Sequence, residues 1–334
     1  MKRRQLTSLF GTASLCLGAG WSDVAAGNGL SNGVRRIGWL SLVKADSEQA
    51  LLGRRVFYEM MQRAGFDERN NLAVERRYAE GDATRLQALA EELVRMEVEL
   101  IVAVTNEAIA AARQATRKIA IVMLGASSPV DLGFVASLAQ PAGNVTGTAS
   151  ELPESAGRIL QTLKEAAPGA VRVGLLFNPK APGGQRYAAA TERAARAFKM
   201  QIDTYDTPRA QDIPGALKRI VAHRMDALVV LSDGVVNTRL PEIASFALRN
   251  RLLTIGNSRQ FTEAGGTLCF GPDIVGLLER TAYFVERILK GAKPAELPVE
   301  PPPRYDLVVN LRTALAMGRS IPPPMLLRAT EVIE

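Results

Sequence analysis

Small polar residues recur at the points where the short apolar runs of this 334-residue chain end. They are hydroxyls, amides and glycines with one carboxylate, so the set can donate and accept hydrogen bonds while carrying little charge. Just before a helix, the exposed backbone N–H groups of such a residue can also hold an anion such as a carboxylate. The candidate ligand-binding residues are Ser41, Thr105, Asn106, Gly125, Ala126, Ser127, Ser128, Asn178, Ser232, Asp233, Asn257 and Ser258.

Any one of these residues, taken alone, is also explained by a helix cap or a turn. The set says more, because open α/β sheets bind their ligands beyond the carboxyl ends of the strands. Asp233 is the one carboxylate of the set. It is predicted either to accept a hydrogen bond or an ammonium group from a ligand, or simply to cap the helix that follows it.

The elements that must position these residues alternate between strand and helix from residue 36 onward. The predicted strands are 37–40, 72–77, 100–104, 119–124, 145–148, 171–177, 201–205, 227–231, 252–255, 267–270 and 307–310. The predicted helices are 47–64, 83–96, 107–116, 129–138, 183–198, 210–221, 235–249 and 274–289. This alternation is typical of parallel sheets covered by helices on both faces. The predicted fold class is α/β, with two doubly wound parallel-sheet lobes joined by crossover hinge strands.

Turn-rich stretches suggest where the chain crosses between the lobes. A first crossover is expected at 140–144 and a second at 265–266, after which helix 274–289 returns to the first lobe. The proline-rich stretch 294–303 is extended and predicts a third crossover. Lobe 1 is therefore expected to comprise 36–143 and 268–296, and lobe 2 to comprise 144–267 and 297–334.

The first 26 residues have the pattern of a cleaved export signal. A basic start at residues 2–4 precedes a short apolar stretch at 6–20, and small residues at 24–26 offer a cleavage site. The apolar stretch is too short for a good membrane span, and Leu15 before Cys16 disfavours lipidation. The arginine pair at 3–4 leaves both the general secretory and the twin-arginine routes open. Residues 27–35 are then a flexible linker, and the mature protein is expected in the periplasm.

Residues suited to metal binding or nucleophilic chemistry are scarce. Once the leader is removed, Cys269 is the only cysteine, and His223, the single histidine, is predicted to be a surface or capping residue at a helix end. The chain has no dinucleotide-binding glycine motif after its first strand, no Walker loop and no nucleophile elbow. We therefore expect no cofactor, no bound metal and no enzyme activity.

The positive charge of the chain is dispersed. The net charge is +7, but lysines and arginines alternate with acids along the predicted helices. Nucleic-acid binders gather basic residues on one face, so no nucleic-acid partner is expected. The expected partners are a small-molecule ligand and, for an importer component, a membrane permease, with the protein itself a monomer.

Seven segments resemble the tryptophan/tyrosine-type substrate-binding proteins of ABC transporters, which have the type I periplasmic-binding fold. The resemblance runs from about Arg36 to Glu334. The segments are 77–81 (RYAEG), 86–94 (LQALAEELV), 129–138 (PVDLGFVASL), 141–147 (PAGNVTG), 261–266 (FTEAGG), 288–294 (ILKGAKP) and 306–314 (DLVVNLRTA).

This resemblance implies a two-lobed binder that closes on its ligand by a hinge motion and docks on a permease. Two places depart from the family pattern: Ser128 stands where an Asp is common, and Gly256, Asn257 and Ser258 stand where aromatic or acidic residues are common. Fewer acids weaken an ammonium pocket, and fewer rings remove stacking surface. A small polar solute or carboxylate is therefore expected as readily as an aromatic amino acid.

The leading hypothesis is an exported solute-binding component of an ABC importer that captures an amino acid or small carboxylate between its lobes. A ligand-sensing receptor module of the same fold, signalling through a partner, is the second hypothesis. A secreted α/β enzyme is the third, and it would need a catalytic group that the motifs do not reveal. Turnover that depends on Asp233 would distinguish the enzyme from the two binding hypotheses.

Overall fold

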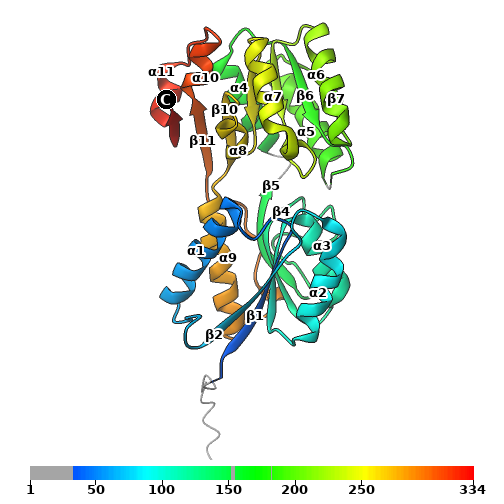
Figure 1. Ribbon diagram of the computed structural model, residues 1–334, viewed down its shortest axis with the longest axis vertical. Helices are drawn as coiled ribbons and strands as arrows, with labels where there is room; N and C mark the ends of the chain where they lie inside the picture. Colours follow the sequence, from blue (N-terminus) through cyan, green and yellow to red (C-terminus); the bar gives the residue numbers. More distant parts are fainter. Residues whose placement is uncertain (1–32, 152–154, 182) are drawn as a thin grey trace, which may run out of the picture. The chain divides into compact units, whose positions relative to one another are not determined.

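The computed structural model describes residues 33–151, 155–181 and 183–334 (Figure 1). The chain divides into two units, 1–33 and 34–334, and the account below concerns the second. The predicted export signal at 1–26 and most of the predicted linker lie outside the described residues.

The first sheet is parallel throughout and has the strand order β2-β1-β3-β4-β5. Its strands are β1 (Arg35–Ser41), β2 (Leu72–Tyr78), β3 (Leu100–Val104), β4 (Ala120–Ser127) and β5 (Val145–Glu151). The order reverses between β1 and β3, which is the switch point where doubly wound sheets bind ligands. Ser41 pairs with Val104 in register, so Ser41 and Thr105 stand at neighbouring strand ends.

Helices cover both faces of this sheet. They are α1 (Glu48–Arg63), α2 (Leu86–Arg95), α3 (Thr105–Ala115) and α9 (Ile274–Leu289). Alternate strand residues point to opposite faces: Ile37 and Trp39 of β1 pack with α1 and α9, whereas Leu40 packs with α2 and α3. Figure 1 shows these helix pairs on opposite sides of the sheet. Burial on both faces explains why β3 is the uninterrupted apolar run LIVAV.

The second sheet has the order β12-β11-β10-β9-β8-β6-β7. Its strands are β6 (Arg172–Phe177), β7 (Gln201–Asp206), β8 (Ala227–Val230), β9 (Leu253–Gly256), β10 (Leu268–Pro272), β11 (Tyr305–Asn310) and β12 (Glu331–Ile333). From β7 to β10 the strands are parallel and repeat the winding of the first sheet, with the switch point between β6 and β8. β11 runs antiparallel to β10 and extends the sheet, and β12 pairs parallel with β11.

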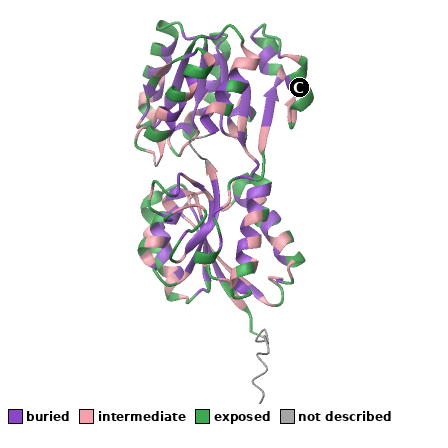
Figure 2. Cartoon of the chain, turned by 180° about the vertical axis from the view of Figure 1, so that it is seen from behind, coloured by how far each residue is buried: buried purple, intermediate pink, exposed green. Residues whose placement is uncertain are grey.

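Two apolar clusters cover the two faces of the second sheet. The helices of this lobe are α4 (Ser155–Ala166), α5 (Gly184–Ala195), α6 (Ile213–Ala222), α7 (Leu240–Arg249), α8 (Arg259–Glu263), α10 (Leu311–Ala316) and α11 (Pro323–Arg328). Val229 of β8 packs in the cluster with α4 and α5, and its neighbour Val230 packs in the cluster with α6 and α7. Figure 2 shows the strands of both sheets as largely buried, with exposed residues on the outer helix faces.

The chain connects the two sheets after β5, after β10 and before β11. The second and third connections are bonded to each other through Asp273, which follows β10, and Arg304, which precedes β11. The Arg304 side-chain Nε lies 2.8 Å from the Asp273 carboxylate, and the Asp273 backbone N–H donates to the Arg304 carbonyl at 3.1 Å. Two crossing segments are therefore hydrogen-bonded to each other where they leave the sheets.

Two strands lie in the sheet opposite to the one predicted. β5, expected in lobe 2, pairs with β4 in the first sheet, and β10, expected in lobe 1, pairs with β9 and β11 in the second. The expected crossovers at 140–144 and 265–266 are therefore turns within a lobe. A turn signal marks a change of chain direction but does not say with which sheet the next strand will pair.

The helix predicted at 129–138 does not form, and its residues make successive turns instead. Gly133 has φ +66°, and the Phe134 N–H donates to the Pro129 carbonyl. Phe134 and Val135 are buried in the core beside α2 and α3. The apolar spacing thus reflects a loop packed on the core, not a helix. Conversely, α4 was not predicted, although Ile159, Leu160 and Leu163 have helical spacing and are buried.

No helix within the described ranges is long and apolar enough to cross a bilayer.

Candidate ligand-binding site

Three buried hydroxyls at strand ends have no hydrogen-bond partner among the described residues: Ser41 Oγ, Thr105 Oγ1 and Ser232 Oγ. Ser41 ends β1, Thr105 follows β3, and Ser232 follows β8, so all three stand at the switch points of the two sheets. A buried hydroxyl without a partner costs about 1–3 kcal/mol. These atoms are therefore candidates for hydrogen bonding to a ligand.

The first lobe holds its strand ends in an uncommon backbone conformation. Thr105 has φ +76° and Ser128 has φ +47°, beside Gly125 at φ +70°. A positive φ is unusual for any residue with a Cβ and a true outlier for a β-branched one. Such conformations cost of order 1–3 kcal/mol and persist where the surrounding structure imposes them. The strain at Thr105 coincides with one of the unpartnered hydroxyls.

Two asparagines of the predicted set tie neighbouring strand ends together. In the first lobe, Asn106 Oδ1 accepts a hydrogen bond from the Ser127 N–H at 3.0 Å. In the second, Asn257 Oδ1 accepts from the Ser232 N–H at 2.9 Å. Both asparagine side chains are buried. Their amide oxygens therefore position the backbone of two serines at the strand ends.

Asp233 is a half-buried carboxylate whose pKa is shifted from its ordinary value. Its Oδ1 accepts from the backbone N–H groups of Val235 at 3.0 Å and Val236 at 2.6 Å. Burial raises the pKa of Asp233 above its ordinary value, although the hydrogen bonds from Val236, Asn178 and Val235 lower it. The negative charge of Glu107, on α3 of the first lobe, raises the pKa further. The Asp233 side chain thus holds the turn at 233–236 and is influenced by the charge of Glu107.

The remaining predicted residues serve the framework. The Gly125 N–H donates to Thr148 Oγ1 at 3.1 Å, and its carbonyl accepts from Ser150 Oγ at 2.8 Å. Ala126 is fully buried in the core beside α2 and α3. Ser258 precedes α8 without capping it through its side chain. The structure therefore brings together Asn106 with Ser127, Asn257 with Ser232, and Asn178 with Asp233, but ties Ser258 to none of them.

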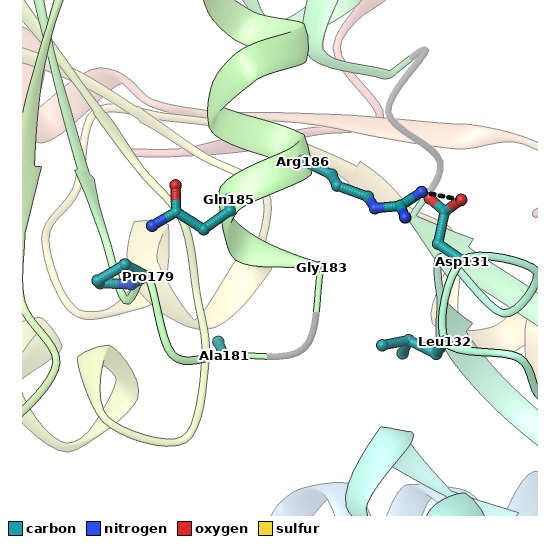
Figure 3. Close-up of a pocket in the computed structure, with 7 residues that line it drawn as sticks. All are labelled: Asp131, Leu132, Pro179, Ala181, Gly183, Gln185 and Arg186. Atoms are coloured by element: carbon teal, nitrogen blue, oxygen red, sulfur yellow. Dashed lines mark ion pairs between the residues drawn. The ribbon is translucent and has the colours of Figure 1, made fainter.

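A small cavity of about 170 Å³ lies beside these residues and is lined by both lobes (Figure 3). Asp131 of the first lobe forms an ion pair with Arg186 at the start of α5. A Cβ on Gly183 would lie 3.3 Å from Ser127 Oγ and 3.4 Å from Ser128 Oγ. Sequence reasoning missed Asp131 and Arg186. No spacing rule pairs two residues so far apart, although Asp131 belongs to one of the segments that resemble the family.

The cysteine and the histidine are structural. Burial raises the pKa of the Cys269 thiol to about 12, so it stays protonated and unreactive at neutral pH. His223 is the C-cap residue of α6, as predicted, and its Nδ1 lies 3.0 Å from the Tyr205 hydroxyl. Within the described residues no three His, Cys, Asp or Glu side chains gather to hold a metal ion.

Two doubly wound lobes, joined by crossing strands and presenting polar strand ends, define the class of type I periplasmic-binding folds. The chain belongs to the ABC transporter substrate binding protein family, whose model matches residues 37–333. This finding agrees with the family resemblance carried by the seven sequence segments.

Individual relatives are distant in sequence. A tyrosine-binding protein of Clostridioides difficile (strain R20291) is 23% identical over 261 residues, which cover 78% of this chain and 75% of that protein. The solved structure of an ABC domain from Streptococcus pneumonia in complex with L-Trp superposes with a TM-score of 0.82 at 22% identity, covering 90% of this chain and 100% of that one. A conserved domain protein from Vibrio cholerae has a TM-score of 0.80 at 24% identity, with 90% and 99% covered. At these identities the structural likeness establishes the fold.

Proposed function

We propose that this protein is the exported solute-binding component of an ABC importer, which binds a small polar ligand, an amino acid or a small carboxylate, between its lobes and delivers it to a membrane permease. It acts by binding and release without chemical conversion of the ligand. The observation that carries the proposal is that three buried hydroxyls at the switch points of the two sheets have no hydrogen-bond partner in the part of the chain that the structure describes. A ligand that hydrogen-bonds them removes the cost of burying them unpaired.

The charge at the strand ends favours a ligand with an ammonium group. Asp233 and Glu107 come from different lobes, and burial, with a smaller contribution from the like charge of Glu107, raises the pKa of Asp233. A cation between two such acids is stabilised by both, and charge-assisted hydrogen bonds are about twice as strong as neutral ones. An α-amino acid carries this cation together with a carboxylate, which hydroxyls and N–H groups at strand ends can bind. The tyrosine-binding relative and the L-Trp complex support the same ligand class.

Export and delivery complete the proposal. The basic start, the apolar stretch and the small residues at 24–26 form a signal that directs the chain to the periplasm. There the protein works as a monomer, and hinge motion about the three crossing segments encloses the ligand. The closed form is then the one that a permease recognises.

The test is a thermal-shift screen of the purified protein against the amino acids, including tyrosine and tryptophan, and against small carboxylates without an amino group. A ligand that binds only the folded state must raise the apparent stability, by about 2.7 kcal/mol at a hundred times its Kd. We expect a stabilising amino acid, and weaker stabilisation by the same molecule lacking its ammonium group. If no member of the panel shifts the Tm, the proposal fails.

A further inference from the structure

A second cavity, of about 570 Å³, lies in the first lobe. Its lining includes Lys118 and Ala120, where β4 begins, and Asn144 and Val145, where β5 begins. It therefore lies at the amino ends of these strands, whereas the candidate ligand-binding site lies at the carboxyl ends. The volume falls within the range of roughly 300–1,000 Å³ that is usual for small-molecule sites.

The lining of this cavity is strongly basic. Arg113, Arg117, Lys118 and Lys293 contribute four cations, and none of the lining residues is acidic. Elsewhere in the fold an arginine can be neutralised by an acid beside it, as where Arg280 contacts Glu300 at 2.6 Å. Lys293 has only a loose contact with Glu296 at 3.9 Å, and both side chains are exposed. The cavity thus collects positive charge that the lining does not neutralise.

Arg113 is the best-defined group of the cavity. Its Nε is buried and has no hydrogen-bond partner among the described residues. The guanidinium lies 5.6 Å from the centre of the Phe134 ring, which is itself buried and lines the cavity. Burial and the positive charge of Arg117 both lower the pKa of Arg113. The position of Arg113 in the last turn of α3 suits the helix dipole, but the dipole does not provide an acceptor for Nε.

We propose that this basic cavity is a second binding site, separate from the ligand-binding site, and that it takes a phosphate group. Tetrahedral oxyanions present several acceptor oxygens at once, and a guanidinium binds them through more than one N–H group. Arg113 supplies the partly buried anchor, and Arg117, Lys118 and Lys293 supply further charge. Free phosphate and the headgroup of an anionic phospholipid share this chemistry.

The test is isothermal titration calorimetry of the full-length mature protein with inorganic phosphate at low ionic strength. We expect the wild-type protein to bind phosphate. Arg113→Gln should lower the affinity by about tenfold or more, as for the loss of a hydrogen bond between charged groups. Arg117→Gln is the second variant, because Arg117 is exposed and its replacement spares the core. Arg95→Gln is the matched control: it removes the same charge from an exposed position on α2 outside the cavity.

Flotation with vesicles identifies the source of the phosphate group. Binding of phosphatidylglycerol vesicles but not phosphatidylcholine vesicles, lost in Arg113→Gln, supports a lipid headgroup, and calorimetric binding of inorganic phosphate supports the free ion. Asp233→Asn, which alters the ligand-binding site, should leave both readouts unchanged. The proposal is overturned if neither probe binds, or if Arg95→Gln weakens binding as much as Arg113→Gln and Arg117→Gln.

Discussion

The two lobes share a winding order but prepare their strand ends differently. The first lobe uses neutral hydroxyls on a strained backbone, with positive φ at Thr105 and Ser128. The second lobe has no positive φ at Asn178, Ser232 or Asp233, and the half-buried carboxylate of Asp233 stands there instead. The strand ends of the first lobe are therefore under backbone strain, whereas those of the second lobe carry a charged group that is partly removed from water.

If both sets of strand ends contact the proposed ligand, this difference gives each lobe a different part of the ligand to recognise. Strained backbone fixes the direction of hydroxyl and N–H groups, which suits the recognition of an uncharged or anionic part of a ligand. A desolvated carboxylate suits the recognition of a cation, because it has lost the water that would otherwise compete. The lobes also share one feature: an asparagine side-chain oxygen, of Asn106 or Asn257, accepts a hydrogen bond from the backbone N–H of a serine at a neighbouring strand end. The predictions below test the difference between the strand ends of the two lobes and the asparagine–serine hydrogen bond that both lobes contain.

The largest expected effect is on ligand affinity, in the second lobe. Asp233→Ala should lower the affinity for the best amino acid of the thermal-shift panel by about ten- to a hundredfold, the worth of a hydrogen bond to a charged group. Calorimetric titration measures the change. The control is Asp206→Ala, which removes an exposed acid at the end of β7. Equal affinities in the two variants would remove Asp233 from the site.

Removal of the asparagine–serine hydrogen bond should cost a similar amount of stability in the two lobes. Asn106→Ala and Asn257→Ala each leave a serine N–H group without its acceptor, which costs about 1–3 kcal/mol of unfolding free energy. Urea unfolding followed by circular dichroism measures both. Asn237→Ala, at an exposed position, should stay within about 0.5 kcal/mol of wild type. A neutral result for either buried asparagine would show that its hydrogen bond does not hold the strand ends.

Backbone strain in the first lobe should be relieved by glycine. Thr105→Gly is expected to raise the free energy of unfolding of the ligand-free protein by about 1 kcal/mol, since glycine adopts φ +76° without strain. The same variant should bind ligand more weakly, because it lacks the hydroxyl. Thr204→Gly, on an exposed strand position with ordinary φ, should instead destabilise the protein by about 0.5–1 kcal/mol. Destabilisation by Thr105→Gly would argue against stored strain.

The smallest expected effect is a pH dependence in the second lobe. The pKa of Asp233 is raised in the folded state, so the folded state holds this proton more tightly than the unfolded chain does. Unfolding free energy should therefore fall as the pH rises from about 4 through the raised pKa and stay level above it. Acids with lowered pKa values, such as Asp226, act in the opposite direction.

The measurement is therefore the difference between wild type and Asp233→Asn in urea unfolding across this pH range. Wild type should lose stability relative to the variant as the pH rises. A difference that grows in favour of wild type with rising pH has the wrong sign and would mean that the folded state favours the ionised carboxylate.

Local pattern was enough to predict most of the elements and the chain positions of the candidate site. Buried parallel strands are short apolar runs, so β3 and α9 have the predicted bounds, 100–104 and 274–289. The residues that follow such strands are known once the strands are known, which is why Ser41, Thr105 and Ser232 were in the predicted set. The bounds of these elements and the residues that follow them depend on residues that are close together in the sequence, so the sequence alone is enough to predict them.

Pairing across the fold was decided by the tertiary structure alone. The sheet to which β5 and β10 belong, the ion pair of Asp131 with Arg186, and the backbone strain at Thr105 all depend on residues far away in sequence. The apolar segment 129–138 has helical spacing, yet it packs as a loop, because burial rewards contact with the core and not any particular backbone conformation. A strand's composition shows that it will be buried on both faces, but only three-dimensional packing selects its partner.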